Sequence, residues 1–377
     1  DLVRLKESGK IRKIIVGGCL AQRYAKDIYK DIPELDGIIG INWDDLIDVL
    51  KKSARGGRVL AVKEKKYLLP YGISRTTRLT PGHYAYLKVS EGCSHRCSYC
   101  AIYNIKGPHR SRALKDIVAE ADWLVSSGVK EINIVGQDTT SYGIDLRPKP
   151  SIAKVLKALN SIKGDFWIRL LYAYPGMVTE ELISCYQSLN KLCRYLDIPI
   201  QHISDKILAR MNRGFSKQEI IGLLEKMRLR ISGLCIRTGF IVGFPGETEK
   251  EFQELLKFIK DFKFERMGAF IYSREENTQA YRFRSQVPES VKKDRFDRLM
   301  SAQNQIAEEV NKKFISRRLK VLIDEEDSEF YVARSEYDAP EVDGVVYIPK
   351  NSKMDVGNFY KATIDRAEDY DLIAKSA

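Results

Sequence analysis

Three cysteines in one short segment are the residues of this 377-residue chain that point most directly to chemistry. Cys93, Cys97 and Cys100 are separated by three and two residues, and they follow an apolar run that is typical of a strand. A cubane of four irons and four sulfides takes one thiolate per iron. Because three thiolates leave one iron open to another ligand, the segment predicts an iron–sulfur cluster that binds a cofactor.

A zinc site is the alternative interpretation of the same segment. Three cysteines and one histidine also suit zinc, and His95 or His109 would complete such a set. Zinc sites usually use paired CxxC knuckles, whereas this spacing is asymmetric. We therefore favour the cluster, and a non-catalytic RNA-binding protein with a structural zinc remains the hypothesis from another functional class.

Polar residues follow two later apolar runs. Gly136, Gln137 and Asp138 come after residues 131–135, and Gln201 and His202 come after a run that ends at Pro199. In barrels built from strand–helix repeats, the site lies at the carboxyl ends of the strands. These residues are candidate cofactor contacts, although a capped polar turn and a structural histidine explain them as well.

Arg237 and Gly243 are further candidates near the end of another apolar run. An arginine there is suited to bind the carboxylate of a cofactor, and the glycines at 243 and 246 allow a close approach of backbone to a ligand. A tight turn accounts for the glycines equally well.

The elements that must position these residues follow an α/β pattern. Residues 1–62 alternate short apolar runs with helical patterns, as in an open parallel sheet. From residue 84 the alternation becomes regular and predicts a partial barrel of six strand–helix units. A long helical stretch over 290–314 is followed by strands at 319–324, 330–333, 342–348 and 359–367, which predict a small antiparallel barrel. The six strands of the partial barrel are expected at residues 84–89, 131–135, 167–173, 195–199, 234–242 and 267–272.

The same pattern divides the chain into domains. We expect an amino-terminal α/β piece over residues 1–62, a linker over 63–80, the barrel over 81–312 and the carboxyl-terminal barrel over 313–377. The chain opens with Asp1 and runs almost at once into a strand-like segment. We therefore expect this piece to be the remnant of a larger domain.

Composition limits the class of protein. The chain has no run of about 18 apolar residues, and its seven cysteines form an odd set without a secretory signal. A cytoplasmic protein with no membrane partner is therefore predicted. The net charge of +12 is uneven, since residues 321–377 contain 14 acidic and 6 basic residues, a balance of −8, which leaves +20 for residues 1–320.

The CxxxCxxC spacing resembles the signature of the radical S-adenosylmethionine superfamily, and the resemblance extends over residues 81–312. The run from Cys100 to Arg112 is similar to that of the methylthiotransferase branch. The resemblance implies a [4Fe-4S] cluster on the three cysteines and S-adenosylmethionine as the cofactor. It places Tyr99 near the adenine, with the amino group of the cofactor methionine at the residues after the second strand.

The resemblance also implies the chemistry. A 5'-deoxyadenosyl radical removes hydrogen from an unactivated carbon, which then receives a methylated sulfur. Such a C–H bond is too weak an acid for side-chain bases, so no residue is predicted to act as a catalytic acid or base. A flavodoxin or ferredoxin is the implied electron donor.

Cys19 lies in a second motif of the same family. Gly17–Gly18–Cys19 leads into a helical pattern, and a helix amino terminus favours the thiolate. By itself, Cys19 suits a buried structural role. The resemblance implies instead that it is one ligand of a second [4Fe-4S] cluster, whose other two cysteines lie upstream of the sequence given. Cys185, Cys193 and Cys235 lie in periodic apolar segments and are predicted to serve packing.

Two substrates are open within this family: transfer RNA and a ribosomal protein. The sequence resembles the ribosomal-protein branch, which modifies the β-carbon of an aspartate. The carboxyl-terminal barrel is similar to the TRAM domain, and its acidic balance disfavours phosphate and favours a basic small-subunit ribosomal protein. Transfer RNA remains the alternative. Residues 314–318 depart from the family, whose members usually have a glycine there. The resemblance to this branch rests on residues 137–143, 171–175, 199–202 and 334–344.

Overall fold

The computed structural model describes residues 1–63, 80–350 and 353–375, and these fall into two units. One unit comprises residues 1–63 together with the short segments 91–94 and 101–109. The other comprises the remaining described residues. All of the predicted linker except its two end residues lies outside the described residues.

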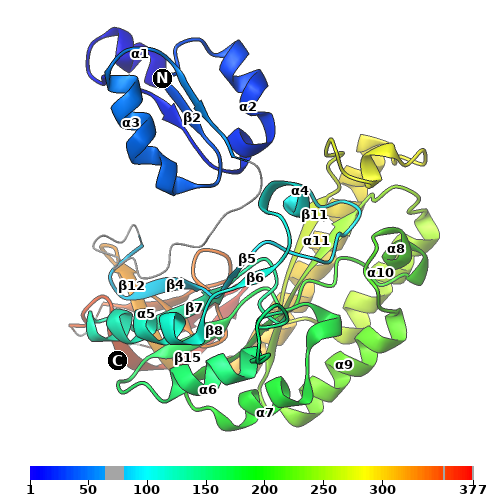
Figure 1. Cartoon of the computed structure of the whole chain (residues 1–377). Coiled ribbons are helices and arrows are strands. Elements are labelled where there is room, and N and C mark those ends of the chain that lie inside the picture. Colours follow the sequence, from blue (N-terminus) through cyan, green and yellow to red (C-terminus); the bar gives the residue numbers. More distant parts are fainter. Residues whose placement is uncertain (64–79, 351–352, 376–377) are drawn as a thin grey trace. The chain divides into compact units, whose positions relative to one another are not determined.

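The first unit contains a three-stranded parallel sheet in the order β1-β2-β3 (Figure 1). A Cβ atom at Gly37 of β2 would lie 2.5 Å from the Cγ1 atom of Val49. Glycine therefore lets α3 pack closely on the sheet. The open α/β pattern that we predicted for these residues is confirmed. Its elements are α1 (Leu2–Glu7), β1 (Ile15–Val16), α2 (Cys19–Asp31), β2 (Gly37–Ile39), η1 (Trp43–Asp45), α3 (Leu46–Ala54), β3 (Val59–Ala61) and α4 (Ile102–Lys106).

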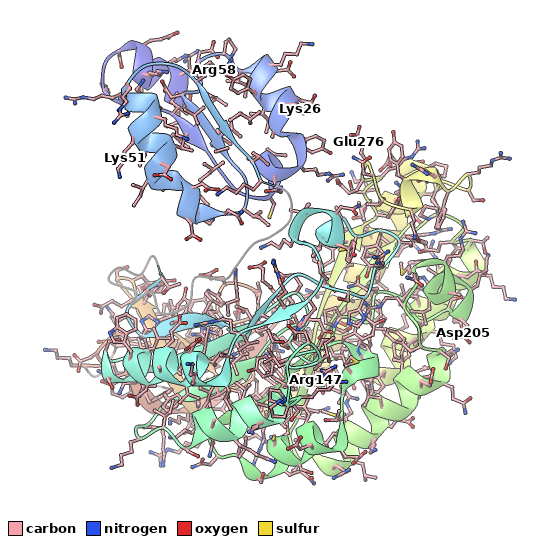
Figure 2. The ribbon with its side chains drawn as sticks, viewed as in Figure 1. Lys26, Lys51, Arg58, Arg147, Asp205 and Glu276 are labelled. Atoms are coloured by element: carbon pink, nitrogen blue, oxygen red, sulfur yellow. The ribbon has the colours of Figure 1, made fainter. Side chains whose placement is uncertain are left out.

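Arg58 ties the end of α2 to the start of β3. Its guanidinium donates to the carbonyls of Ile32 at 2.9 Å and Leu35 at 3.1 Å, and it lies 4.0 Å from the ring centroid of Tyr29. Figure 2 shows Arg58 on this unit, with Lys26 pointing outward from its helix. The contacts satisfy helix-end carbonyls that would otherwise have no partner.

The second unit is built on a six-stranded parallel sheet in the order β11-β10-β9-β8-β7-β4. Within this sheet, strands that follow one another along the chain are neighbours, as strand–helix repeats require. The six predicted strands are confirmed, with ends shifted by up to three residues. The strand expected to end at Ala173 stops at Leu170 because Tyr172 adopts a left-handed φ of 60°. The strands are β4 (Tyr84–Lys88), β7 (Glu131–Val135), β8 (Trp167–Leu170), β9 (Leu192–Asp197), β10 (Cys235–Val242) and β11 (Arg266–Ile271).

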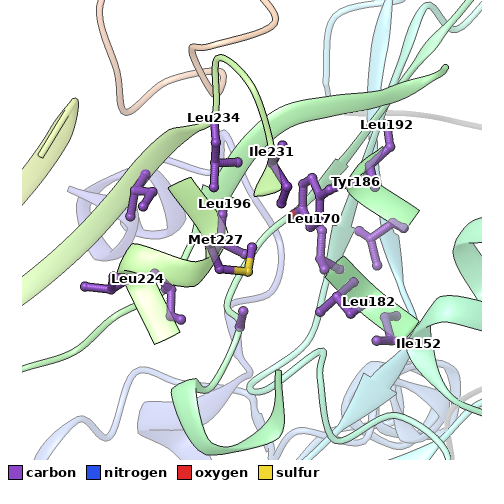
Figure 3. Packing of buried hydrophobic residues seen from close by; sticks show 14 of the residues in the cluster. Ile152, Leu170, Leu182, Tyr186, Leu192, Leu196, Leu224, Met227, Ile231 and Leu234 are labelled. Atoms are coloured by element: carbon purple, nitrogen blue, oxygen red, sulfur yellow. The ribbon is translucent and has the colours of Figure 1, made fainter. Parts of the chain in front are cut away.

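Helices cover one face of this sheet and bury the main apolar core. Figure 3 shows Leu196 of β9 with Leu224 and Met227 of α9 (Lys217–Arg230) in this core. Capping boxes begin two of the helices, at Ser216 and at Thr248. The helices are α5 (Leu114–Ser126), α6 (Ile152–Asn160), α7 (Glu180–Ser188), α8 (Asp205–Arg210), α9 (Lys217–Arg230), α10 (Glu249–Phe262) and α11 (Glu289–Asn311), with short turns η2 (Pro175–Met177), η3 (Ala280–Arg282) and η4 (Lys312–Phe314).

A closed five-stranded barrel follows α11, in the order β12-β13-β14-β16-β15. We predicted four strands and antiparallel pairing throughout. The structure adds β16 and pairs it in parallel with β14. The parallel pair has a geometric cause, since an odd number of strands cannot alternate in direction all the way around a closed barrel. The strands are β12 (Arg318–Glu326), β13 (Phe330–Ser335), β14 (Val346–Pro349), β15 (Phe359–Glu368) and β16 (Asp371–Ala374).

The segment just before this barrel contains a residue in a glycine-like conformation. Ser316 has a φ of 67°, and its amide donates to the carbonyl of Ile364 at 2.9 Å. Left-handed backbone favours glycine. The conformation is the one that the glycine of the family pattern adopts without strain, and nothing in the structure explains the serine.

The second face of the six-stranded sheet packs on the barrel through buried ion pairs. Arg169 of β8 and Arg334 of β13 both pair with Glu131 of β7, each at 2.7 Å. Arg334 also pairs with Asp324, at 2.6 Å. Arg266 of β11 pairs with Asp338. Several acidic residues of the barrel are therefore paired inside the molecule. In the described part of the chain, no helix is long and apolar enough to cross a membrane.

Candidate functional site

The cysteine segment lies between β5 (Ser90–Glu91) and α4, directly after the first strand of the six-stranded sheet. The three cysteines form no disulfide and are partly exposed. The amide of Cys93 donates to the carbonyl of Gly107 at 3.2 Å. Gly92 has a φ of 78°, and a Cβ atom there would lie 2.2 Å from the carbonyl oxygen of Pro108. The backbone that carries Cys93 therefore requires glycine at position 92.

A turn after α8 holds the part of the segment that carries Cys97. Ser98 donates from its amide to the carbonyl of Met211 at 3.0 Å and from its hydroxyl to the carbonyl of Arg210 at 2.7 Å. The side chain of Asn212 donates to the carbonyl of Arg96 at 3.0 Å. Arg96 has a left-handed φ of 52°. These bonds fix the conformation of the loop from two sides.

Arg213 brings a positive charge to the cysteines. Its Nη1 atom lies 3.6 Å from the Sγ atom of Cys97, and its Nη2 atom donates to the carbonyl of Pro199 at 2.6 Å. The guanidinium packs on the rings of Tyr174 and Phe215 and is 5% exposed. The arrangement favours an anionic group at the cysteines, as a cluster with thiolate ligands would be.

His95 lies between two of the cysteines and is held firmly. Its Nε2 atom lies 2.6 Å from the Oδ2 atom of Asp138, and its ring stacks on Tyr174 at 3.6 Å between centroids. Burial raises the pKa of Asp138, but hydrogen bonds from His95, Ser141 and Thr140 outweigh it and lower the pKa below its usual value. The predicted cofactor residue Asp138 is thus engaged by its own loop and by the cysteine segment.

Unpartnered polar atoms lie near the other residues that follow β7. Within the described residues, Gln137 Oε1 and Ser90 Oγ are buried without a hydrogen-bond partner. A Cβ atom at Gly136 would lie 2.6 Å from Ser90 Oγ. Asn133 of β7 is fully buried, and neither its Oδ1 nor its Nδ2 atom has a partner in the described part of the chain. Buried polar groups are normally paired, so these atoms fit a polar ligand.

Tyr99 packs against an apolar cluster. Its ring meets that of Phe244 edge to face at 6.4 Å, within a cluster that includes Met211 and Tyr272. Burial raises the pKa of Tyr99 well above its usual value, so the phenol is neutral. The predicted contact of Tyr99 with the adenine stays a prediction.

Gln201 and His202 lie together at the end of the strand region that continues β9. Gln201 has a φ of 77° and forms a backbone bridge with Phe240. His202 is fully buried, with its Nδ1 atom accepting from the amide of Ser204 at 3.0 Å and its Nε2 atom 3.4 Å from Glu247. These contacts are those of a structural histidine, and the predicted contact of His202 with the cofactor stays a prediction.

Gly243 is the residue that Glu247 positions. Both carboxylate oxygens of Glu247 accept from the Gly243 amide, at 3.1 and 3.0 Å, and Arg295 pairs with the same carboxylate at 2.8 Å. Gly243 has a φ of 72° and lies against Lys292. The predicted tight turn is present, and close approach to a ligand remains a prediction.

Arg237 has partners that the sequence did not indicate. It pairs with Asp197 at 3.1 Å and with Asp343 of the carboxyl-terminal barrel at 3.3 Å. The guanidinium is therefore engaged at the junction with the barrel. The predicted contact of Arg237 with the cofactor carboxylate stays a prediction.

Cys19 lies in the first unit as the first residue of α2, and it is exposed. Gly18 before it has a φ of 110°. The predicted turn from strand to helix is confirmed, and the thiol stands at a helix amino terminus, where a thiolate is favoured.

Sequence reasoning missed Arg213 because an arginine in a turn after a helix carries no signal of its own. Its role follows only from the fold, which brings a residue 116 positions away to Cys97. The described residues include no group of three or more His, Cys, Asp or Glu side chains arranged to hold a single metal ion. A cubane differs from such a site because each thiolate binds a separate iron.

The comparisons with known proteins agree with this geometry. A family model for the Radical SAM superfamily matches residues 87–259, and a model for the TRAM domain matches residues 315–376. A solved cobalamin-dependent S-adenosylmethionine radical enzyme, OxsB with aqua-cobalamin and S-adenosylmethionine bound, shares the fold with a TM-score of 0.52. That chain is 16% identical, and the match covers 81% of this chain and 45% of that one.

Curated relatives match almost the whole chain. The protein from Thermoanaerobacter sp. (strain X514) is 44% identical over 375 residues, which is 98% of this chain and 86% of the relative. The protein from Pelotomaculum thermopropionicum is 44% identical over 380 residues, covering 100% and 85%. The protein from Clostridioides difficile (strain 630) is 40% identical over 375 residues, covering 99% and 84%. All three are named ribosomal protein uS12 methylthiotransferase RimO.

Proposed function

The chain belongs to the family of the ribosomal protein uS12 methylthiotransferases, and on this premise we propose that it adds a methylthio group to the β-carbon of an aspartate in uS12. The enzyme is a radical S-adenosylmethionine methylthiotransferase. The observation that carries the proposal is identity of 40–44% to relatives of that name over nearly the full chain. The cysteine segment after the first strand of a six-stranded parallel sheet supplies the matching chemistry.

The residues present suit the cofactors that this activity needs. Cys93, Cys97 and Cys100 would hold a [4Fe-4S] cluster through three thiolates, and Arg213 supplies a positive charge beside one of them. When bound, the cluster supplies the electron that splits S-adenosylmethionine into methionine and the 5'-deoxyadenosyl radical, which removes hydrogen from the carbon that receives sulfur.

The protein's own residues bind and orient the cofactor. Ser90 Oγ and Gln137 Oε1 are buried and unpartnered in the described part of the chain, so they suit the polar groups of the cofactor methionine, with Gly136 leaving space beside them. Tyr99 offers an apolar wall for the adenine. Asp138 acts through His95, which it fixes within the cysteine segment. Gln201 and Gly243 remain proposed contacts at neighbouring strand ends.

A second [4Fe-4S] cluster is part of the proposal, with Cys19 as one ligand. The exposed thiol at the first turn of α2 supports this role, because a helix amino terminus stabilises a thiolate. When the two further cysteine ligands that the family resemblance implies are present, Cys19→Ser should lower the iron content while leaving cleavage of S-adenosylmethionine intact. Loss of cleavage in that variant would contradict the proposal that the cluster on Cys93, Cys97 and Cys100 cleaves S-adenosylmethionine without the second cluster.

The protein partners belong to the same proposal. We expect uS12 as substrate, a flavodoxin or ferredoxin as electron donor, and the cytoplasm as the compartment. Transfer RNA is the second candidate, and one observation keeps it in the test: the acidic residues Asp324, Asp338 and Asp343 of the barrel are paired internally. Their charge therefore repels phosphate less than the composition suggests.

The experiment begins with anaerobic reconstitution, iron and sulfide analysis and a visible spectrum. Reconstituted protein is then incubated with S-adenosylmethionine, a low-potential reductant and either uS12 or unmodified transfer RNA, and products are identified by mass spectrometry. A methylthio group on an aspartate of uS12 is expected. Methylthiolated nucleoside in place of the modified aspartate would overturn the substrate, and zinc in place of iron would overturn the enzyme class.

A further inference from the structure

Arg213 is a buried cation that forms no ion pair with a carboxylate of the described residues. Among the described residues, its side chain reaches the thiol of Cys97, the carbonyl of Pro199 and the faces of two aromatic rings. Its Nε atom is buried and unpartnered there. Burying a guanidinium without a counter-charge costs several kcal/mol. An arginine cannot relieve this cost by losing its proton.

The missing counter-charge is a thiolate. Cys97 is the titratable group that Arg213 contacts with a hydrogen-bond donor, with 3.6 Å between Nη1 and Sγ. A thiolate bound to iron at this position would bring the negative charge that the cation lacks. The ring of Tyr174 holds the guanidinium at 4.4 Å, and the turn that carries Arg213 also binds Arg96 and Ser98. The cation is therefore fixed with respect to the sulfur.

From this arrangement we infer that Arg213 is a positioned counter-charge of the cluster and shifts its reduction equilibrium toward the reduced state. The inference rests on the proposed function, because it requires a cluster on Cys97. A [4Fe-4S] cluster with three thiolates carries one more negative charge after it accepts an electron. A fixed cation in a site of low dielectric favours that state. Arg213 thus helps a one-electron donor to load the cluster, without touching the substrate.

The test compares variants of the full chain after anaerobic reconstitution. Arg213→Gln and Arg213→Met remove the charge, and Arg213→Lys keeps it. Arg210→Gln is the matched control, since Arg210 donates to the carbonyl of Pro245 and packs on Phe283 in the same region, and no bond from its guanidinium to a cysteine is found among the described residues. Iron content is measured first, and the reduction midpoint of the cluster is then followed by electron paramagnetic resonance.

We expect Arg213→Gln and Arg213→Met to disfavour the reduced cluster at least tenfold, which corresponds to about 59 mV for a one-electron couple. Arg213→Lys should show a smaller shift, and Arg210→Gln none. A full complement of iron with an unchanged midpoint in Arg213→Gln would overturn the inference while leaving the proposed function standing. Absence of iron from the wild-type chain would instead overturn the proposed function.

Thermal unfolding provides a second test of the counter-charge that does not depend on enzyme activity. A cluster bound through Cys97 would add negative charge beside Arg213, so Arg213→Met should cost more stability in the reconstituted protein than in the apoprotein. A residue needed only for packing would cost the same in both states, and that result would count against the counter-charge. If the Gln and Met variants hold no iron, retention of iron by Arg213→Lys supports the inference, and its loss from all three contradicts it.

Discussion

At the scale of single residues, surroundings separate the cysteines of the cluster segment from the others. Cys185, Cys193 and Cys235 are buried in apolar clusters, as we predicted, and burial raises the pKa of each thiol. Such thiols stay protonated and serve packing. Cys97, by contrast, is partly exposed and lies beside a cation. A metal-bound thiolate at this position would have a cation beside it.

The first prediction concerns Cys97. Cys97→Ala should remove one ligand of the cluster and abolish production of 5'-deoxyadenosine, because an iron without its thiolate is lost or becomes accessible to solvent. The product is measured by chromatography after anaerobic reconstitution. Cys185→Ala is the control and should retain iron and activity. Continued 5'-deoxyadenosine production by Cys97→Ala would contradict the ligand assignment.

A second prediction concerns the pH dependence of the first unit. Asp36 accepts from Lys6 at 2.7 Å, from Lys13 at 2.9 Å and from the amide of Ile14 at 2.9 Å. Burial raises the pKa of Asp36, but these three partners outweigh it and lower the pKa from 3.8 to about 2. A lowered pKa means that the carboxylate stabilises the folded state above pH about 4, and that this contribution is lost as the pH falls toward about 2.

Hydrogen exchange of residues 1–63 at several pH values measures this contribution. Exchange should accelerate as the pH is lowered through that window, beyond the intrinsic effect of pH on exchange. Asp36→Asn should exchange faster than wild type at neutral pH and lack the additional acceleration. An identical pH profile for the two proteins would show that Asp36 is not the group responsible.

At the scale of elements, the conformation of short turns decides where the site residues lie. The cysteine segment is held by backbone hydrogen bonds and by left-handed residues rather than by a regular helix or strand. Turns of this kind tolerate few substitutions, because a Cβ atom meets fixed backbone.

Gly92 provides a prediction at this scale. Gly92→Ala places a Cβ atom 2.2 Å from the Pro108 carbonyl oxygen and in a left-handed conformation, so the backbone of Cys93 must move. We expect iron content after reconstitution to fall severalfold. Gly128→Ala is a matched control, since Gly128 is also left-handed, with a φ of 94°, but no heavy atom lies within 4 Å of its Cβ position. Equal iron content in the two variants would contradict the role of the close contact.

Ser316 gives the opposite expectation. Its φ of 67° is strained for a residue with a Cβ atom, so Ser316→Gly should stabilise the protein. The relief of a left-handed conformation, less the greater entropy of an unfolded glycine, is about 0.5–1 kcal/mol. Chemical denaturation measures this difference. A lower free energy of unfolding in the variant would show that the serine side chain compensates for its conformation.

At the scale of the whole second unit, a buried ionic junction joins the six-stranded sheet to the carboxyl-terminal barrel. Glu131 lies between Arg169 and Arg334, all of them fully buried or nearly so. Asp324 accepts from His83 at 2.8 Å and pairs with Arg334 at 2.6 Å. Because removal of one partner leaves a buried charge unpaired, this junction makes the barrel an integral part of the unit.

Arg334→Met tests the junction. Loss of the guanidinium removes a partner of both Glu131 and Asp324, and we expect a decrease of roughly 3–5 kcal/mol in the free energy of unfolding. The exposed pair of Arg366 and Glu368 is the comparison, and Arg366→Met should change stability by about 0.5 kcal/mol or less. Equal effects of the two substitutions in chemical denaturation would show that the junction contributes no more than a surface ion pair.

The sequence by itself determined the α/β class, the positions of the six strands of the second unit and the cysteine segment. These depend on local patterns: alternating apolar runs predict strands and helices, and three thiols within eight residues stay close in any fold. The structure decided which charges meet. Composition gave the barrel a balance of −8, but the fold pairs Asp324, Asp338 and Asp343 with arginines. Arg213 reaches Cys97, and Arg237 pairs at the barrel junction, because tertiary packing joins residues that lie far apart in the chain and local patterns carry no information about such contacts.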